Sequence, residues 1–362
     1  MAEVADIVRL HGEAYGQKYR HGLTSAQQQA LADIRHCRTP FFGGHVHQCG
    51  HCGKEIYSYH SCRNRSCPKC HHNQTERWLA RQQDRLPPCP YYLVTFTVPA
   101  ELHAIARSHP RKVYSLMMRA AADALQKLAR DPRYLGARIG ALAVLHTWTR
   151  AMLFHPHVHM LVTAAGVSPD GSRWIQPQNP AFLVPVRALS ILFRAKLCAA
   201  LKKADLLGRI PPAVWKNAWV VHSQHAGSGR KVLDYLGRYV FRIAISNNRI
   251  DSIDGGTVQF RYRDNSTQQI RHVTLSGEEF LRRFLQHVPP RGLMKVRHYG
   301  ILSRRCRTLP VWTPLPVGQP QTPLTEPALS FPPASSSPRC PLCRIGLLIL
   351  RQHLAPVRSH SP

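Results

Sequence analysis

Three histidines alternate with other residues in the segment His155-Pro156-His157-Val158-His159. Alternate side chains of a β-strand share one face, so the three imidazoles would lie on the same side of a strand. Apolar residues flank the segment, which predicts that the other face of this strand is buried. Two imidazoles two residues apart on a strand converge on one point, as a divalent metal ion requires. His157 and His159 are therefore predicted ligands of a catalytic metal ion.

The third ligand of this metal ion has two candidates. Residues 140–147 and 154–163 have the composition of two strands joined by a short polar turn, which predicts an antiparallel hairpin. In that hairpin His146 would lie opposite His157. His155 is the alternative. Ordinary exposed histidines at a polar strand edge are the competing interpretation, but three histidines on a buried strand would need partners.

A second candidate group consists of two tyrosines. Tyr235 and Tyr239 are four residues apart in a stretch with helical character, so they would share one helix face and suit two alternating nucleophiles. A phenol, with a pKa of about 10, is a poor nucleophile at neutral pH unless a metal ion or cationic side chains stabilise the developing charge. The cationic candidates are Lys231, Arg238 and Arg242. Without the histidine strand, the same pair would indicate an ordinary core or surface helix.

Two CxxC motifs, Cys49-Gly-His-Cys52 and Cys67-Pro-Lys-Cys70, are separated by fourteen residues. This spacing is typical of a zinc ion held tetrahedrally by four thiolates. Such a site has no open position, so the zinc would fold and orient its module rather than catalyse. A redox CxxC normally occurs singly beside a βαβ pattern. We therefore predict one structural Zn²⁺ on these four cysteines.

The same module contains further potential ligands and basic residues. Cys62 could join the four-cysteine site. A second ion is an alternative for the remaining candidates, which are Cys37, His45, His47, His60, His71 and His72. Arg63 and Arg65 lie between the motifs, close to two tyrosines, and this combination suits phosphate contacts and base stacking. A solvated basic face is the alternative interpretation.

The composition indicates a nucleic-acid partner. Lys and Arg number 49 against 19 Asp and Glu, a formal charge of +30 that a polyanion would offset. No apolar run approaches the roughly 18 residues that span a bilayer, and no signal peptide opens the chain, so we expect a cytoplasmic protein with neither a membrane nor a small-molecule partner. Eleven cysteines in such a protein indicate metal binding rather than disulfides. The scarcity of acids disfavours a nuclease with two carboxylate-bound metal ions.

Composition also divides the chain into three parts. Residues 1–85 would hold a leader helix, capped by Ser25 and Gln28, and the zinc-binding domain. Residues 90–305 have the mixed pattern of an α+β catalytic domain. Expected elements there include helices near 112–130, 185–204 and 230–241, a strand at 218–224, a hairpin at 258–275 and a helix capped by Ser276. The Pro/Ser-rich tail, residues 309–362, is predicted to be disordered, with an isolated CxxC at Cys340 and Cys343 that has no partner motif.

Taken together, the Cys-rich module, HPHVH and the downstream YLGRYVFRIAISNNRI resemble transposases of the insertion sequence 91 family, which are two-tyrosine members of the HUH nuclease superfamily. The stretches CRTPFFGGHVHQC, SCRNRSCPKC, VLHTW and GLMKVRHYGIL extend the resemblance over about residues 15–305. Two departures stand out: Ser66 replaces an expected histidine, and the tail after residue 305 is shortened, so an inactive or truncated copy is an alternative.

The resemblance implies an HUH palm-like antiparallel sheet that carries the histidines, flanking helices that include the tyrosine helix, and a small zinc-binding domain in front. It also implies Mg²⁺ or Mn²⁺ as the catalytic ion and a 5′-phosphotyrosine intermediate of rolling-circle transposition. The partners would be single-stranded DNA at transposon ends and target DNA, in the bacterial nucleoid. Alternatives are an HUH replication initiator or relaxase and a non-catalytic zinc-dependent DNA-binding remnant.

Overall fold

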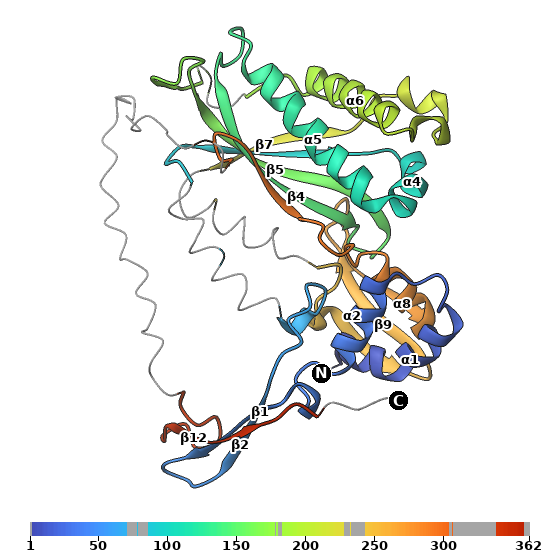
Figure 1. Cartoon of the computed structure of the whole chain (residues 1–362), viewed down its shortest axis with the longest axis vertical. Coiled ribbons are helices and arrows are strands. Elements are labelled where there is room, and N and C mark those ends of the chain that lie inside the picture. Colours follow the sequence, from blue (N-terminus) through green and yellow to red (C-terminus); the bar gives the residue numbers. More distant parts are fainter. Residues whose placement is uncertain are drawn as a thin grey trace.

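The computed structural model describes residues 2–70, 78, 86–177, 179, 183–227, 232, 243–303, 306 and 338–357. These residues form antiparallel sheets with packed helices (Figure 1), which confirms the expected α+β class. Within these ranges, no helix combines the length and apolar character needed to span a bilayer.

The largest sheet has the strand order β11-β4-β5-β3-β7, and the short β6 pairs with β5. Its strands are β3 (Tyr91–Thr97), β4 (Arg138–Trp148), β5 (Phe154–Val167), β6 (Trp174–Ile175), β7 (Val221–Gly227) and β11 (Val296–Gly300). Every pairing is antiparallel. β4 and β5 form the expected hairpin and lie inside the sheet. Because packed side chains cover both faces of β4 and β5, these two strands bury long runs of consecutive residues.

Three helices cover one face of this sheet (Figure 1). They are α4 (His103–Ser108), α5 (Pro110–Ala129) and α6 (Val186–Lys203). Met117 from α5, Phe193 from α6, and Phe96 and Val158 from the sheet are all fully buried in the main core. The alternation along β5 sends Val158 and Met160 into this core, so His157 and His159 lie on the opposite face.

The opposite face carries a smaller apolar cluster. Leu142 and Val144 of β4 and Leu161 of β5 pack there, together with Val232. Val232 is 1% exposed and comes from a distant part of the sequence. This face therefore holds both the histidines and a buried residue that lies three positions before Tyr235 in the sequence.

A second unit joins the beginning of the chain to residues 250–285. It consists of α1 (Val4–Lys18), α2 (Ser25–Arg35), β8 (Ile250–Asp254), β9 (Thr257–Arg263), β10 (Ile270–Ser276) and α8 (Gly277–Leu285). Ile7, Ile34 and Phe280 share one apolar cluster. Gly277 allows α1 to approach α8 closely, because a Cβ at this position would lie 2.2 Å from the ring of His11. Apolar contacts therefore join residues on both sides of the domain boundary that the sequence predicts between residues 85 and 90.

The helix starts of this unit depend on short polar side chains. Thr24 accepts a hydrogen bond from the Gln27 amide and forms a capping box with it, so the cap of α2 lies one residue before the predicted Ser25. Ser276 Oγ accepts from the Glu279 amide at 3.2 Å and caps α8 as expected.

The third sheet has the order β12-β1-β2 and lies at the opposite end of the long axis from the six-stranded sheet (Figure 1). Its strands are β1 (Gly44–Cys49), β2 (Glu55–Tyr59) and β12 (Leu348–Leu354). β12 runs antiparallel to β1 along its whole length. The prediction of a disordered tail is therefore wrong for residues 338–357, because the apolar stretch that follows the Pro/Ser-rich segment supplies a strand. Residues 307–337 lie outside the described part of the chain.

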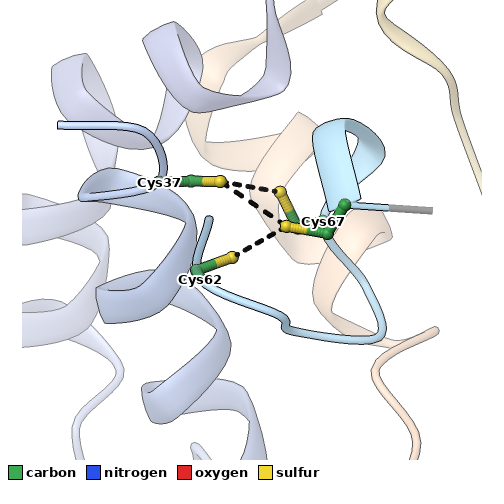
Figure 2. Close-up of side chains that lie close together, drawn as sticks. Cys37, Cys62 and Cys67 are labelled. Atoms are coloured by element: carbon green, nitrogen blue, oxygen red, sulfur yellow. Dashed lines mark hydrogen bonds between the residues drawn. The ribbon is translucent and has the colours of Figure 1, made fainter. Parts of the chain in front are cut away.

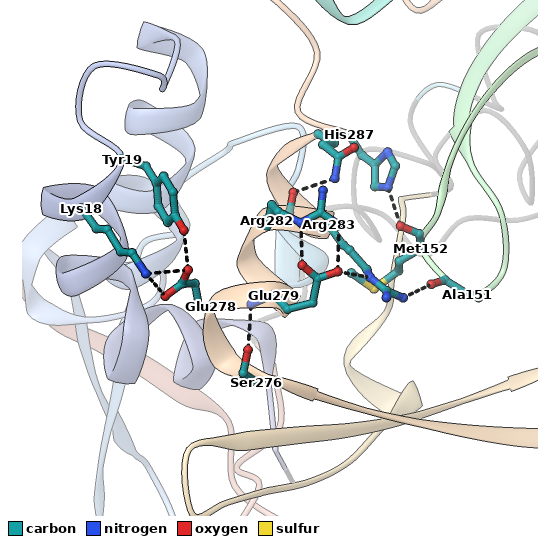
Figure 3. Close-up of polar contacts among 11 residues, drawn as sticks. Lys18, Tyr19, Ala151, Met152, Ser276, Glu278, Glu279, Arg282, Arg283 and His287 are labelled. Carbon is teal, nitrogen blue, oxygen red and sulfur yellow. Dashed lines mark hydrogen bonds and ion pairs between the residues drawn. The ribbon is translucent and has the colours of Figure 1, made fainter. Parts of the chain in front are cut away.

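The tip of the β4–β5 hairpin packs against the second unit and forms hydrogen bonds with it (Figure 3). Met152, at φ 60°, is fully buried in the apolar cluster of that unit. Its carbonyl accepts a hydrogen bond from His287 Nε2 at 3.2 Å, and the carbonyl of Ala151 accepts from Arg283 Nη1 at 3.4 Å. Arg283 is itself paired with Glu279 at 2.7 Å. The hairpin that carries the histidines is thus held at its end by α8 and the residues that follow it.

Candidate metal and nucleic-acid site

Three histidines meet on the face of the six-stranded sheet opposite α4, α5 and α6: His146 from β4 and His157 and His159 from β5. His146 lies directly opposite His157 in the strand register, as expected. The candidate donor atoms of the trio all lie within 4.8 Å of one another. This spacing suits three ligands of one divalent cation and leaves further coordination positions for a substrate.

His155, the other candidate for the third ligand, is not part of the group of converging donor atoms. Its ring centroid lies 5.4 Å from that of His157 and 6.0 Å from that of His103 on α4. Burial lowers the pKa of His155 and of His103 below the usual value, which favours the neutral form of both rings near pH 7. Of the two candidates, the structure brings His146 into the cluster.

Neighbouring groups orient the histidine rings. Nδ1 of His157 donates a hydrogen bond to the carbonyl of His155 at 2.7 Å, so Nδ1 carries the proton and Nε2 is the ring nitrogen that could bind a metal ion. Nδ1 of His159 lies 3.0 Å from the hydroxyl of Thr95, its register partner on β3. Trp148 stacks on His146 with ring centroids 4.8 Å apart and an interplanar angle of 24°. The contacts of Thr95 and Trp148 with the histidines were not predicted from the sequence, since only the strand pairing shows which residues face the trio.

A cavity of about 390 Å³ adjoins the trio through Trp148, which lines it. Phe154 adds a second aromatic wall, and the lining also includes Arg65, Arg107 and Lys295. The Arg107 guanidinium lies over the Phe154 ring at 5.2 Å, and the Lys295 amine lies over Trp148 at 5.0 Å. Cations held over aromatic rings suit both the phosphates and the bases of a nucleic-acid strand.

His287 forms another part of this cavity wall. Burial lowers its pKa to about 4, so the ring is neutral near pH 7. Because Nε2 donates to the Met152 carbonyl, Nδ1 accepts from the Thr147 hydroxyl at 3.2 Å. His287 therefore links the hairpin to the segment after α8 as a neutral residue.

The predicted nucleophiles and their cationic neighbours lie outside the described residues. They are Tyr235, Tyr239, Lys231, Arg238 and Arg242. The two arginines of the Cys-rich module lie in different surroundings. Both side chains are exposed, but the Arg65 guanidinium donates to the carbonyls of Leu293 at 2.7 Å and Pro290 at 3.3 Å. Arg65 thus ties the Cys-rich module to the loop before β11.

The predicted single four-cysteine site is wrong, because the structure separates the two CxxC motifs into different clusters. The first cluster contains Cys37, Cys62, Cys67 and Cys70. The sulfur–sulfur distances are 3.6 Å for Cys37–Cys67 and Cys37–Cys70, and 3.5 Å for Cys62–Cys70 (Figure 2). Cys62 thus joins the CPKC motif, and Cys37, placed directly after α2, completes the set.

The second cluster contains Cys49, Cys52, Cys340 and Cys343. Sγ of Cys49 lies 3.6 Å from that of Cys343, and Sγ of Cys52 lies 3.9 Å from that of Cys340. The C-terminal CxxC therefore has a partner motif, contrary to the expectation from the sequence. A count of eight clustered cysteines, twice what one zinc ion needs, was the signal that could have indicated two sites.

The four sulfurs of the first cluster have the spacing of a structural zinc site. Four sulfurs at about 2.3 Å from a central ion lie about 3.8 Å apart, close to the observed spacing. Hydrogen bonds from the neighbouring thiols, Cys37 first, lower the pKa of Cys70 far below its usual range, while the same thiols raise the pKa of Cys62 and Cys67. Four thiolates at such distances require a cation between them.

Comparisons with known proteins identify a family of transposases. Residues 7–98 match a family model described as "Transposase zinc-binding domain", and residues 140–309 match one described as "Putative transposase". Over 327 residues the chain is 42% identical to "Putative transposase y4qJ" of Sinorhizobium fredii, an alignment that covers 84% of this chain and 81% of that protein. It is 30% identical over 301 residues to "Transposase for insertion sequence element IS801" of Pseudomonas savastanoi pv. phaseolicola, covering 78% and 72%. No solved structure matches the chain significantly.

Proposed function

Because the chain belongs to the insertion sequence 91 family of transposases, we propose that it nicks and rejoins single-stranded DNA at transposon ends by a rolling-circle mechanism. The observation that carries this proposal is the convergence of His146, His157 and His159 on the face of the sheet opposite α4, α5 and α6. Three imidazoles at this spacing suit a catalytic cation.

The trio would hold Mg²⁺ or Mn²⁺ through the ring nitrogens that point toward one another. A divalent cation bound there supplies stabilisation of the negative charge that develops on the scissile phosphate. The protein residues keep the rings in position: the carbonyl of His155 and the hydroxyl of Thr95 hold Nδ1 of His157 and His159, so that Nε2 of each faces the cation.

In the proposed reaction, the phenol oxygen of Tyr235 or Tyr239 attacks the phosphorus atom. The bond from tyrosine to phosphorus forms, the bond to the 3′-oxygen breaks, and the departing oxygen takes a proton to become a 3′-hydroxyl. Rejoining reverses these steps with another 3′-hydroxyl, so no ATP is consumed. The position of Val232, buried on the histidine face three residues before Tyr235, supports this assignment.

The DNA strand would bind beside the trio, in the cavity lined by Trp148, Arg107 and Lys295. The formal charge of +30 adds long-range attraction for a polyanion, and the affinity should fall steeply with salt. We place this activity in the cytoplasm, on nucleoid DNA.

The test is formation of a covalent protein–DNA adduct. Purified protein is incubated with Mn²⁺ and end-labelled single-stranded DNA from the ends of the element, and the adduct is measured on a denaturing gel. We expect an adduct with the wild type, none with His157→Ala, and a reduced amount or none with Tyr235→Phe or Tyr239→Phe. Strand binding without any adduct would instead support a non-catalytic zinc-dependent DNA-binding protein. Cleavage of plasmid-origin sequences in preference to transposon ends would support a replication initiator or relaxase.

A further inference from the structure

We propose that Cys49, Cys52, Cys340 and Cys343 bind a second structural Zn²⁺ and that this ion clamps the C-terminal strand β12 onto the N-terminal module. The family model for the zinc-binding domain ends at residue 98, so it does not include the two C-terminal cysteines. The proposal concerns the architecture of the chain and is independent of the cleavage reaction.

The geometry of the four sulfurs is that of a tetrahedral zinc site. The two distances between the motifs, 3.6 Å for Cys49–Cys343 and 3.9 Å for Cys52–Cys340, bracket the spacing of about 3.8 Å expected around zinc. Cys49 is 2% exposed and Cys340 is 1% exposed, so half of the sulfur ligands are shielded from solvent. Among the contacts that the structure describes, no cationic side chain lies against these four sulfurs.

The two CxxC motifs also have the same local backbone. The amide of Gly53 donates to the carbonyl of Cys49 at 3.0 Å, and the amide of Arg344 donates to the carbonyl of Cys340 at 2.9 Å. Gly53 and Arg344 both follow the second cysteine directly and both have positive φ, 69° and 61°. A non-glycine residue pays an energetic cost for that conformation. Two distant segments therefore adopt one knuckle conformation, as paired ligand loops of a zinc site do.

Backbone amides point at the sulfurs, as they do around thiolates. Cys49 Sγ accepts from the amides of His51 and Cys52, both at 3.4 Å, and Cys343 Sγ accepts from the amide of Gly346 at 3.5 Å. Gly346 also lets the two loops meet, because a Cβ there would lie 2.5 Å from Cys49 Sγ.

The apolar core at this end of the molecule is too small to hold β12 without help. It consists of Cys49, Cys340 and Leu348, with three partly buried neighbours. Ile345, Ile349 and other apolar side chains of the same segment are largely exposed. Small modules with so little buried apolar area usually depend on a metal ion or a disulfide, and the cysteines here are free. A zinc ion shared by both loops would supply the missing stabilisation.

The first part of the test is metal content. Full-length protein purified without chelator should hold two zinc ions per chain, measured by elemental analysis, and Cys340→Ser/Cys343→Ser should hold one. Cys37→Ser/Cys62→Ser should lose the other ion, and Cys198→Ser, outside both clusters, should keep two. With Co²⁺ in place of Zn²⁺, the tetrathiolate absorption of the wild type should be halved in either double variant. A wild type with one zinc ion per chain would overturn the proposal.

The second part tests the clamp itself. A site-specific protease sequence is inserted after Ser330, the chain is cut there, and the C-terminal fragment is followed by size-exclusion chromatography. We expect the fragment to co-elute with the rest of the protein, and to separate after treatment with a strong zinc chelator or in Cys340→Ser/Cys343→Ser. In Cys37→Ser/Cys62→Ser it should stay bound. Separation in the presence of zinc, or retention after full zinc removal, would refute the clamp.

Discussion

His146 on β4 and His157 on β5 lie directly opposite each other, and a β-bulge follows His146 before the strands pair again at Trp148 and Phe154. The extra residue is on β5, between Phe154 and His157. On β4, Trp148 is two residues from His146, shares its face of the strand and stacks on its ring. The cross-strand pair His146–His157 thus defines the centre of the proposed catalytic cation site.

The first prediction separates the two candidates for the third ligand. His146→Ala should weaken Mn²⁺ binding and reduce adduct formation by about 100-fold or more, because the cation loses one of three protein ligands. His155→Ala should change both by less than about threefold, since its ring nitrogens are not among the converging donor atoms. Calorimetric titration with Mn²⁺ and the adduct assay measure the two quantities. Equal effects of the two substitutions would contradict the assignment of His146.

The second prediction concerns Thr95, which orients His159. Thr95→Val removes the hydroxyl but keeps the shape of the side chain, so metal affinity should fall by about 10- to 100-fold while the melting temperature changes little. Thr95→Ser retains the hydroxyl and should restore most of the affinity. The measurement is the Mn²⁺ dependence of adduct formation. A loss in both variants would point to packing instead of the hydrogen bond.

The third prediction distinguishes the two arginines of the Cys-rich module. Arg63→Gln should lower single-stranded DNA affinity and reduce the slope of log affinity against log salt by about 1, with no loss of stability, because the side chain is exposed. Arg65→Gln should lower stability by about 1 kcal/mol, since two backbone carbonyls near the surface lose a charged donor. Fluorescence anisotropy and thermal melts provide the readouts. If both variants lose DNA affinity and neither loses stability, the structural role of Arg65 is wrong.

The fourth prediction is a pH dependence of stability that originates at His287. In the folded protein burial lowers its pKa to about 4, whereas the unfolded chain binds the proton near pH 6.5. Between these values the unfolded state binds more protons, so the free energy of unfolding decreases as the pH falls, by about 2 kcal/mol from this residue at pH 5. Near and above pH 7 the effect disappears.

A substitution that does not titrate isolates this effect. His287→Gln can still donate to the Met152 carbonyl and accept from Thr147, and it should show a smaller loss of melting temperature between pH 7 and pH 5 than the wild type. The exposed His21→Gln should follow the wild-type curve. Parallel curves for all three proteins would exclude His287 as the source.

The sequence alone determined the α+β class, most helix positions and the histidine strand. These features are local: strand alternation places His157 and His159 on one face, and a short turn dictates which residue of the preceding strand lies opposite. Helices α5 and α6 and the cap of α8 at Ser276 could be predicted from the sequence for the same reason. Helical spacing, together with the histidine strand, also predicted the tyrosine pair, which lies outside the described residues.

Only the tertiary structure decided which cysteines share a metal site. A CxxC motif fixes two ligands by local geometry, but the other two come from whatever segment the fold brings near, and closing a longer loop costs little additional entropy. Cys49 therefore meets Cys343, 294 residues away, rather than Cys67, 18 residues away. Contacts between segments far apart in the sequence also explain why Arg65 donates to carbonyls in the loop before β11 and why β12 pairs with β1. Spacing along the chain identifies residues that can bind a metal ion, and long-range strand pairing selects their partners.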